Sequence, residues 1–245
     1  MIVATKPQLS VVVPIYNEQG SIRPLFARLF SVLDNLGSSF EVVAVDDGSN
    51  DATPAILGEE TRRRDALRVL TLDRNCGQHA AICTGFEAAR ADWIVTLDAD
   101  LQNPPEEIPR LVEALRAGHD FVGTIRRVRR DTRFRRVASR LNGVITRRVS
   151  GVNIGDFGSM LRGYHRTVIE PIVKRREPGA FVPVLGARYA RNPTEIPVDH
   201  AVREQGQSKY SLWRLCRLHV DLIRTASASS AERSDLKEVD HPRSR

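Results

Sequence analysis

Two carboxylates spaced one residue apart, Asp98 and Asp100, follow an apolar run in the segment WIVTLDADLQNPPEEIP (93–109). In a regular strand such residues share a face but lie more than about 6 Å apart, so a turn is needed to bring both onto one ion. Hard cations such as Mg²⁺ or Mn²⁺ take oxygen ligands and share them with phosphates of a bound ligand, and Gln102 could add an amide oxygen. The alternative is that these acids cap a helix that begins near Pro105.

Similar polar clusters follow other apolar runs. Asp46 and Asp47 close the segment FEVVAVDD (40–47), where a carboxylate could accept hydrogen bonds from the base or ribose of a nucleotide. The alternative for these acids is an Asx turn into the next helix. Glu106 and Glu107 need no functional interpretation, because acids suit the first turn of a helix.

Two cations occupy a glycine-containing stretch near the C-terminus, REQGQSKY (203–210). The guanidinium of Arg203 and the ammonium of Lys209 could hold a diphosphate, although ordinary loop charge is the alternative. Asp156, in DFGSMLRGY (156–164), is by itself more typical of a turn or helix cap than of catalysis.

The segment TIRRVRRDTRFRRVASRLNGVITRRVSG (124–151) carries ten arginines and one acid. From Phe134 onward its apolar residues recur on one helical face, which predicts a basic amphipathic helix over part of 126–150. Such a helix could lie in an anionic membrane interface or pack its apolar stripe on the domain. Interleaved aromatic residues and known nucleic-acid modules are absent from the sequence, so a nucleic-acid partner is not expected.

The elements that must position these residues alternate between strand and helix. Short β-branched runs predict strands, and apolar residues at helical spacing predict helices, with Ser21 and Asp51 as caps and Gly37 as a stop. This alternation predicts an α/β fold in which helices cover both faces of a mostly parallel sheet. The expected strands span 9–18, 40–51, 67–75, 92–100 and 120–126, and the expected helices span 21–37, 51–64, 77–90 and 104–118.

The polar clusters therefore fall at the carboxyl ends of strands, where open sheets of this kind bind ligands. A GxGxxG after the first strand and a GxxxxGK[ST] motif are both missing, which argues against a dinucleotide fold and a P-loop. The 245-residue chain, with 41% hydrophobic residues, suits one domain with an appendage. Its net charge of +7 favours an anionic partner, and three cysteines without a CxxC pair favour a reducing cytosol.

Several motifs together resemble the family 2 inverting glycosyltransferases, and within them the polyprenyl-phosphate glycosyltransferases. These include dolichol-phosphate mannose synthases and the bacterial undecaprenyl-phosphate sugar transferases used in lipid A modification. The resemblance implies a GT-A domain over 1–215. The motifs, in the order of the family, are VVPIYNE, VDDGSNDAT, NCGQHAAICTGF, LDADLQNPPEEIPRLV, DFGSMLRGY and HAVREQGQSKYS, covering roughly 9–215.

This resemblance also implies a nucleotide-sugar donor such as a UDP-sugar, a divalent metal (Mg²⁺ or Mn²⁺) and a polyprenyl phosphate acceptor. An acceptor phosphate is already anionic, so a strong base is not required, whereas a sugar hydroxyl would need one and Asp156 would be the candidate. The implied roles are nucleotide contacts for Pro14, Tyr16, Glu18, Asp46 and Asp47, metal contacts for Asp98, Asp100 and Gln102, diphosphate contacts for Arg203 and Lys209, and catalytic positions for Asp100 and Asp156.

The C-terminal region departs from the family pattern. Bacterial relatives continue into two transmembrane helices, whereas residues 216–245 here predict a truncated juxtamembrane helix and a polar, disordered tail. No run of about 18 apolar residues is present. We therefore expect a peripheral protein at the cytoplasmic face of the inner membrane, with a membrane-anchor partner or a homo-oligomer as options. The alternatives are a soluble transferase acting on a saccharide hydroxyl, or an inactive truncated homologue acting as a basic binding module.

Overall fold

The computed structural model describes residues 6–126, 159–175 and 181–199, and its first part alternates strands and helices as the sequence predicts. The elements are β1 (Leu9–Ile15), α1 (Ile22–Asp34), β2 (Phe40–Asp46), α2 (Thr53–Arg63), β3 (Leu67–Thr71), α3 (Gln78–Ala88), β4 (Trp93–Thr96), the 3₁₀ turn η1 (Pro105–Glu107), α4 (Ile108–Arg116), β5 (Phe121–Arg126), β6 (Arg162–His165), α6 (Arg166–Arg175), α7 (Val182–Tyr189) and β7 (Pro193–Val198).

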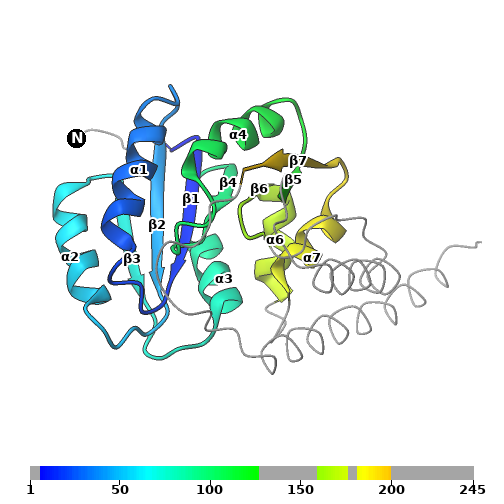
Figure 1. The fold of residues 1–245 in the computed structure, drawn as a ribbon. Coiled ribbons are helices and arrows are strands. Elements are labelled where there is room, and N and C mark those ends of the chain that lie inside the picture. Colours follow the sequence, from blue (N-terminus) through cyan, green and yellow to red (C-terminus); the bar gives the residue numbers. More distant parts are fainter. Residues whose placement is uncertain (1–5, 127–158, 176–180, 200–245) are drawn as a thin grey trace, which may run out of the picture.

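The strands form one sheet in the order β3-β2-β1-β4-β6-β5-β7 (Figure 1). Neighbouring strands are parallel except that β6 runs antiparallel to both β4 and β5. The prediction of a mostly parallel sheet is confirmed. Because β6 runs against its neighbours, its first residue lies at the edge where β4 ends.

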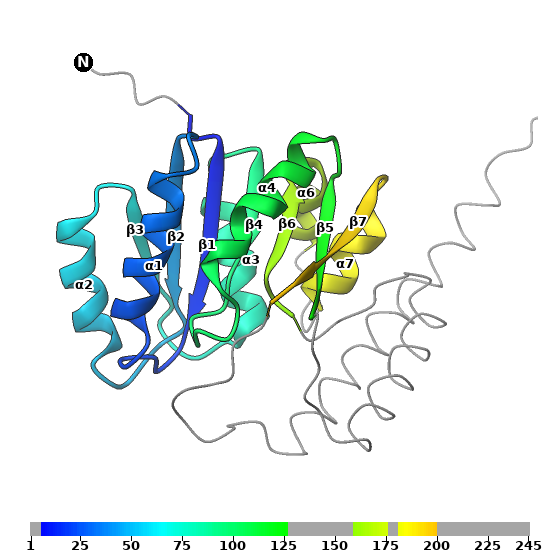
Figure 2. The ribbon, with the colours of Figure 1, turned by 45° about the horizontal axis from the view of Figure 1, so that its top comes forward.

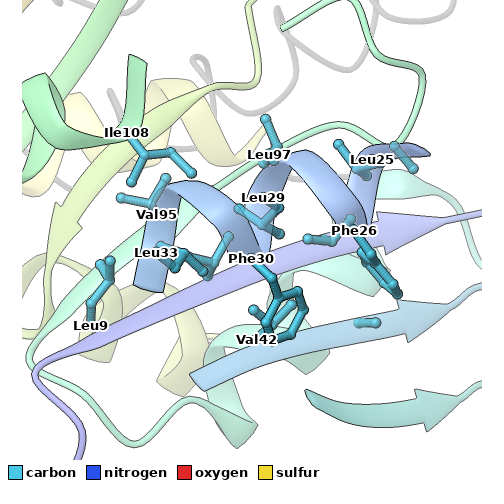
Figure 3. Close-up of a cluster of buried hydrophobic side chains, with 14 of the residues drawn as sticks. Leu9, Leu25, Phe26, Leu29, Phe30, Leu33, Val42, Val95, Leu97 and Ile108 are labelled. Atoms are coloured by element: carbon cyan, nitrogen blue, oxygen red, sulfur yellow. The ribbon is translucent and has the colours of Figure 1, made fainter. Parts of the chain in front are cut away.

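Helices cover both faces of the sheet, as the sequence predicts (Figure 2). Residues of α1, α2 and α4 share one apolar cluster with one face of the sheet, and residues of α3, α6 and α7 share a second cluster with the other face. β1 lies between β2 and β4 and is buried along its whole length, which explains its run of β-branched residues. Figure 3 shows the first cluster, in which Phe26 and Phe30 of α1 pack near Val42 of β2.

The two predicted helix caps differ in outcome. The N-cap of α2 is Ala52, and Asp51 lies one residue before it, where its carboxylate accepts the Thr53 N–H at 2.9 Å in an Asx turn that leads into the helix. Ser21 precedes α1, but its hydroxyl donates to Glu18 instead of accepting from the helix. Gly37 follows α1 with a φ of +67°, which agrees with its predicted role as a helix stop.

The order of the strands creates a switch point between β1 and β4. The chain steps outward from β1 to β2 and β3, then crosses back to place β4 on the other side of β1. Loops leaving β1 and β4 therefore diverge, and ligands of open α/β sheets bind at such a point.

Several predicted features lie outside the described residues: Asp156, Arg203, Lys209, the predicted basic helix beyond Arg126, and the C-terminal region 216–245. Within the described ranges, no helix is both long and apolar enough to cross a membrane.

Candidate functional site at the carboxyl edge of the sheet

Hydrogen bonds join the loops that follow β1 and β2. The Asn17 N–H donates to Ser49 Oγ at 2.9 Å, and the Asn50 N–H donates to Asn17 Oδ1 at 2.9 Å. The Glu18 N–H donates to Thr53 Oγ1 at 2.9 Å. Asn17 has a φ of +53°, a conformation that asparagine tolerates better than most residues. The two loops therefore form one hydrogen-bonded unit.

Asp46 ends β2 inside this unit and is 1% exposed. Its Oδ1 accepts the N–H of Ser49, three residues on, at 3.1 Å, so the side chain closes the turn after β2, whereas an Asx turn would use the residue two on. Its Oδ2 is buried without a hydrogen-bond partner among the described residues. A buried carboxylate oxygen without a donor is costly, so this atom suits the hydroxyl or N–H group of a ligand. Tyr16 and Glu18 are partly exposed, and Pro14 is buried within β1.

Asp47 connects β2 to the loop after β3. Its two carboxylate oxygens accept the N–H groups of Cys76 at 2.7 Å and Gly77 at 2.9 Å, and the residue is 2% exposed. Burial raises the pKa of Asp47, although these two N–H donors oppose that rise. Asp47 therefore fixes the start of α3, a contact that the sequence analysis did not predict.

Asp98 follows β4 and is held by two amide side chains. Its Oδ1 accepts from Gln78 Nε2 at 2.6 Å, and its Oδ2 accepts from Asn103 Nδ2 at 3.2 Å. Burial, and next the charge of Asp100, raise the pKa of Asp98 to about 7. The Gln78 hydrogen bond and the charge of Arg162 oppose this rise, whereas Glu18 adds to it. Three carboxyl groups therefore gather where little positive charge balances them.

The turn that the sequence predicts after Asp98 is present. The Gln102 N–H donates to Asp100 Oδ1 at 3.1 Å, and Leu101 between them has a φ of +62°. Such a φ is rare for leucine, and strained backbone of this kind clusters at functional sites. The Leu101 side chain packs on the first apolar cluster, while Asp100 and Gln102 remain partly exposed. The turn therefore holds two oxygen-bearing side chains at the surface.

These residues could take part in a metal site but do not complete one. Within the described residues, no group of three or more His, Cys, Asp or Glu side chains could hold an ion by itself. Each Asp98 oxygen accepts one amide donor and keeps a second lone pair, so Asp98 could share a cation with Asp100, Gln102 and oxygens of a bound ligand. Mg²⁺ is commonly bound in this way, through few carboxylates and substrate phosphates. Burial first, and the charges of Asp100 and Glu18 next, raise the pKa of Asp98, and a cation here would offset both effects.

Arg162 is a charged residue at this edge that the sequence analysis did not single out. It begins β6 opposite Thr96 at the end of β4, and it is 0% exposed. Its Nε donates to the Ser159 carbonyl at 2.8 Å. Since its charge lowers the pKa of Asp98, it partly balances the carboxyl groups. The sequence signal that could have indicated this residue is an arginine within SMLRGY, a stretch with no other charged residue.

Glu107 has a role beyond the helix dipole that the sequence analysis assigned to it. Its Oε1 accepts the Asp199 N–H at 3.0 Å, and its Oε2 accepts from Arg110 Nη1 at 2.6 Å. Arg110 Nη1 also donates to the Pro197 carbonyl at 2.6 Å. Glu107 therefore ties η1 to the end of β7, whereas its neighbour Glu106 pairs with Arg28 at the surface.

The chain matches a known family model. The model described as glycosyl transferase family 2 covers residues 10–173. The undecaprenyl-phosphate 4-deoxy-4-formamido-L-arabinose transferase of Edwardsiella ictaluri is 49% identical over 216 residues, which are 88% of this chain and 66% of that protein. The protein of the same name from Pseudomonas syringae is 48% identical, with 88% and 64% covered. The chain thus spans just under two thirds of these relatives.

Solved structures share the fold at low sequence identity. Glucosyl-3-phosphoglycerate synthase from Mycobacterium tuberculosis, in complex with Mn²⁺ and UDP-glucose, matches with a TM-score of 0.62 and 19% identity, covering 91% of this chain and 78% of that one. Staphylococcus aureus TarS 1–349, in complex with UDP-GlcNAc, matches with a TM-score of 0.57 and 19% identity, covering 87% and 66%. These neighbours are GT-A glycosyltransferases, so the predicted fold is confirmed.

Proposed function

Because this chain belongs to glycosyl transferase family 2, we propose that it transfers a sugar from a nucleotide diphosphate to a polyprenyl phosphate. The curated relatives carry undecaprenyl phosphate and 4-deoxy-4-formamido-L-arabinose in their names, and we propose this acceptor and this sugar. One observation carries the proposal: hydrogen bonds join the loops that follow β1, β2, β3 and β4 at the switch point. The Asp46 oxygen without a partner among the described residues lies on the β2 side of this site, and Asp98 and Asp100 lie on the β4 side.

We assign the donor to these two ends of the site. Asp46 Oδ2 would accept a hydrogen bond from the nucleoside, with Pro14, Tyr16, Glu18 and Asp47 on that side of the site. A uracil nucleotide is favoured because the solved neighbours hold UDP or UDP-sugars.

Asp98, Asp100 and Gln102 would hold a divalent cation together with the donor diphosphate. The Mn²⁺ in one neighbour supports this assignment. When bound, the cation would balance the negative charge that develops on the diphosphate as the sugar leaves. Arg203 and Lys209 would add fixed positive charge there, and Asp156 would lie near the reacting carbon.

The acceptor phosphate would attack the sugar without help from a strong base, since it is anionic near neutral pH. The chain would therefore need to orient the phosphate and keep it from repelling the carboxyl groups. The ten arginines of 124–151 would attract the polyprenyl phosphate and the anionic membrane surface around it. We propose on this basis a peripheral association with the cytoplasmic face of the membrane.

A transfer assay tests the proposal. A panel of UDP- and GDP-sugars, including UDP-4-deoxy-4-formamido-L-arabinose, is offered with undecaprenyl phosphate or with a soluble saccharide as acceptor. We expect transfer to the lipid phosphate that EDTA abolishes. Transfer to the saccharide alone would move the assignment to a hydroxyl acceptor, and activity indifferent to EDTA would exclude the metal.

Asp100→Asn is the variant that tests the carboxylate. We expect it to lower transfer by about 100-fold or more while circular dichroism stays unchanged, because a neutral amide cannot compensate the charge of the cation. Asp34→Asn is the matched control, since Asp34 is an exposed acid at the end of α1. Full activity of Asp100→Asn would contradict the assignment.

A further inference from the structure

Gln78 is a neutral side chain that contacts the acid cluster from another element. It is the first residue of α3, and its Nε2 donates to Asp98 Oδ1 at 2.6 Å. Asn103, which is 2% exposed, donates to the other oxygen of Asp98 at 3.2 Å. The carboxylate of Asp98 thus accepts one donor at each oxygen, and the Gln78 donor comes from a different element, α3.

The backbone that carries Gln78 is itself fixed. Gly77 precedes it with a φ of +95°, in the region where glycine is favoured. Asp47 accepts the N–H groups of both Cys76 and Gly77, so the start of α3 is tied to the end of β2. A hydrogen-bonded path therefore runs from Asp47 through the start of α3 and Gln78 to Asp98.

The chemical type of residue 78 matters as much as its position. A lysine or arginine there would hold Asp98 equally well but would cancel part of the negative charge that a cation needs. A glutamate would add a further carboxyl group to Glu18, Asp98 and Asp100. A primary amide donates a hydrogen bond without adding charge, so it orients the carboxylate and leaves its charge for a cation.

We propose that Gln78 is a positioning residue of the donor site, which orients Asp98 for a divalent cation and the donor diphosphate while leaving the charge of Asp98 available. This inference rests on the proposed function. Residues that orient metal-binding groups affect metal affinity or activity by about 10–100-fold when they are changed. Among the described residues the Gln78 side chain donates to Asp98, so the nucleoside side of the site around Asp46 should not depend on it.

The test measures Mn²⁺ binding in the presence of UDP, followed by the electron paramagnetic resonance of free Mn²⁺, and uridine binding by calorimetry. For Gln78→Met, which keeps the length but loses the donor, we expect Mn²⁺ affinity to fall by about tenfold. Uridine affinity should stay within twofold of the wild type, whereas general damage to the fold would weaken it too. The control is Asn35→Leu, which removes an exposed amide that donates to the Ser31 carbonyl at the end of α1.

Gln78→Lys provides the second variant and also serves if Gln78→Met does not fold. It keeps a donor toward Asp98 but adds a charge, so we expect Mn²⁺ affinity to fall by tenfold or more. The inference is overturned if either folded variant binds Mn²⁺ within twofold of the wild type, or if uridine affinity falls in parallel with Mn²⁺ affinity. A wild-type protein that binds UDP but no Mn²⁺ overturns the proposed metal role and this inference with it. If the wild-type protein binds no UDP, the proposed function itself fails.

Discussion

Gly48 lies in the turn after β2, where a side chain has no room. Its φ is +67°, and an added Cβ would lie 2.5 Å from the backbone carbon of Arg74. Gly48→Ala should lower the free energy of unfolding by about 2–3 kcal/mol, because both the backbone conformation and the contact resist it. Gly58→Ala in α2 should raise it by about 0.5–1 kcal/mol, since open space surrounds that position. Chemical denaturation compares the pair, and equal effects would contradict the prediction.

Asp98 should make the metal-free protein less stable as the pH rises. Its pKa is about 7 in the folded protein, against 3.8 for an aspartate exposed to water, so the folded state keeps the proton to a higher pH than the unfolded state does. Stability from this group is therefore present below pH 4 and is lost as the pH rises to 7. The difference in free energy of unfolding between the neutral variant Asp98→Asn and the wild type should therefore shift by about 2 kcal/mol in favour of the variant between pH 5 and pH 8.

Urea denaturation in EDTA at pH 5 and pH 8 measures this gain. Comparing the two pH values removes any constant effect of the lost hydrogen bond, and Mn²⁺ with UDP should restore the wild type at pH 8. A stability difference between variant and wild type that is the same at both pH values would show that Asp98 keeps an ordinary pKa.

Several residue roles could not be predicted because their partners are distant in the sequence. The sequence indicates that acids end β2 and β4, and local patterns suffice for that. It does not indicate that Asp47 accepts N–H groups from Cys76 and Gly77, or that Glu107 accepts one from Asp199. Backbone donors carry no signature in the residue type, so such contacts emerge only when loops meet in space.

At the scale of elements, Glu107 joins η1 to β7 and offers a comparison with its neighbour. The Glu107 side chain is 11% exposed and accepts from Asp199 and Arg110, whereas the Glu106 side chain is 52% exposed and pairs with Arg28. Glu107→Ala should lower the free energy of unfolding by about 1–2 kcal/mol, because it removes two hydrogen bonds that a largely buried carboxylate accepts. Glu106→Ala should lower it by less than about 1 kcal/mol, because exposed ion pairs contribute little.

Thermal and urea denaturation of both variants checks this prediction. Amide hydrogen exchange adds a local measure, since the Asp199 N–H should lose protection in Glu107→Ala and keep it in Glu106→Ala. If both variants lose the same free energy of unfolding, the contacts of Glu107 are no stronger than the exposed ion pair of Glu106.

The elements up to residue 126 could be predicted, and those after residue 158 could not. The first group contains long apolar runs and helices with clear spacing, so local pattern decides the structure. β6 has four residues, including the buried Arg162, and β7 begins with a proline and contains another at Pro197. α6 contains Pro171. Pairing with β4 and β5 decides these strands, and prolines are compatible with β7 because it is the edge strand of the sheet among the described residues.

At the scale of the whole molecule, net charge should govern association with membranes. The chain carries a net charge of +7, and each basic residue near an anionic surface contributes about 1 kcal/mol. We expect sedimentation with anionic liposomes at low salt and release at high salt, because the Debye length falls from about 30 Å at 0.01 M to about 3 Å at 1 M. Replacing Arg133, Arg135, Arg136 and Arg140 with glutamine should abolish sedimentation.

Neutral liposomes are the control for this measurement. The same replacement should slow transfer to a polyprenyl phosphate more than it slows hydrolysis of the donor, because only the lipid acceptor is recruited at the membrane. A wild-type protein that ignores anionic liposomes at every salt concentration would contradict a peripheral association.

The position of β6 also bears on how the chain folds while it is being synthesised. In the part of the chain that the structure describes, β5 pairs with β6 and β7, and both leave the ribosome after it. Synthesis of the chain from Arg126 to His165 takes roughly 2–8 seconds at bacterial rates of about 5–20 residues per second. During that interval β1 to β4 can already assemble, while the apolar segment FVGTIR has no strand to receive it. The nascent chain should therefore expose the edge of β4 and the unpaired segment of β5 to chaperones until β6 pairs between them.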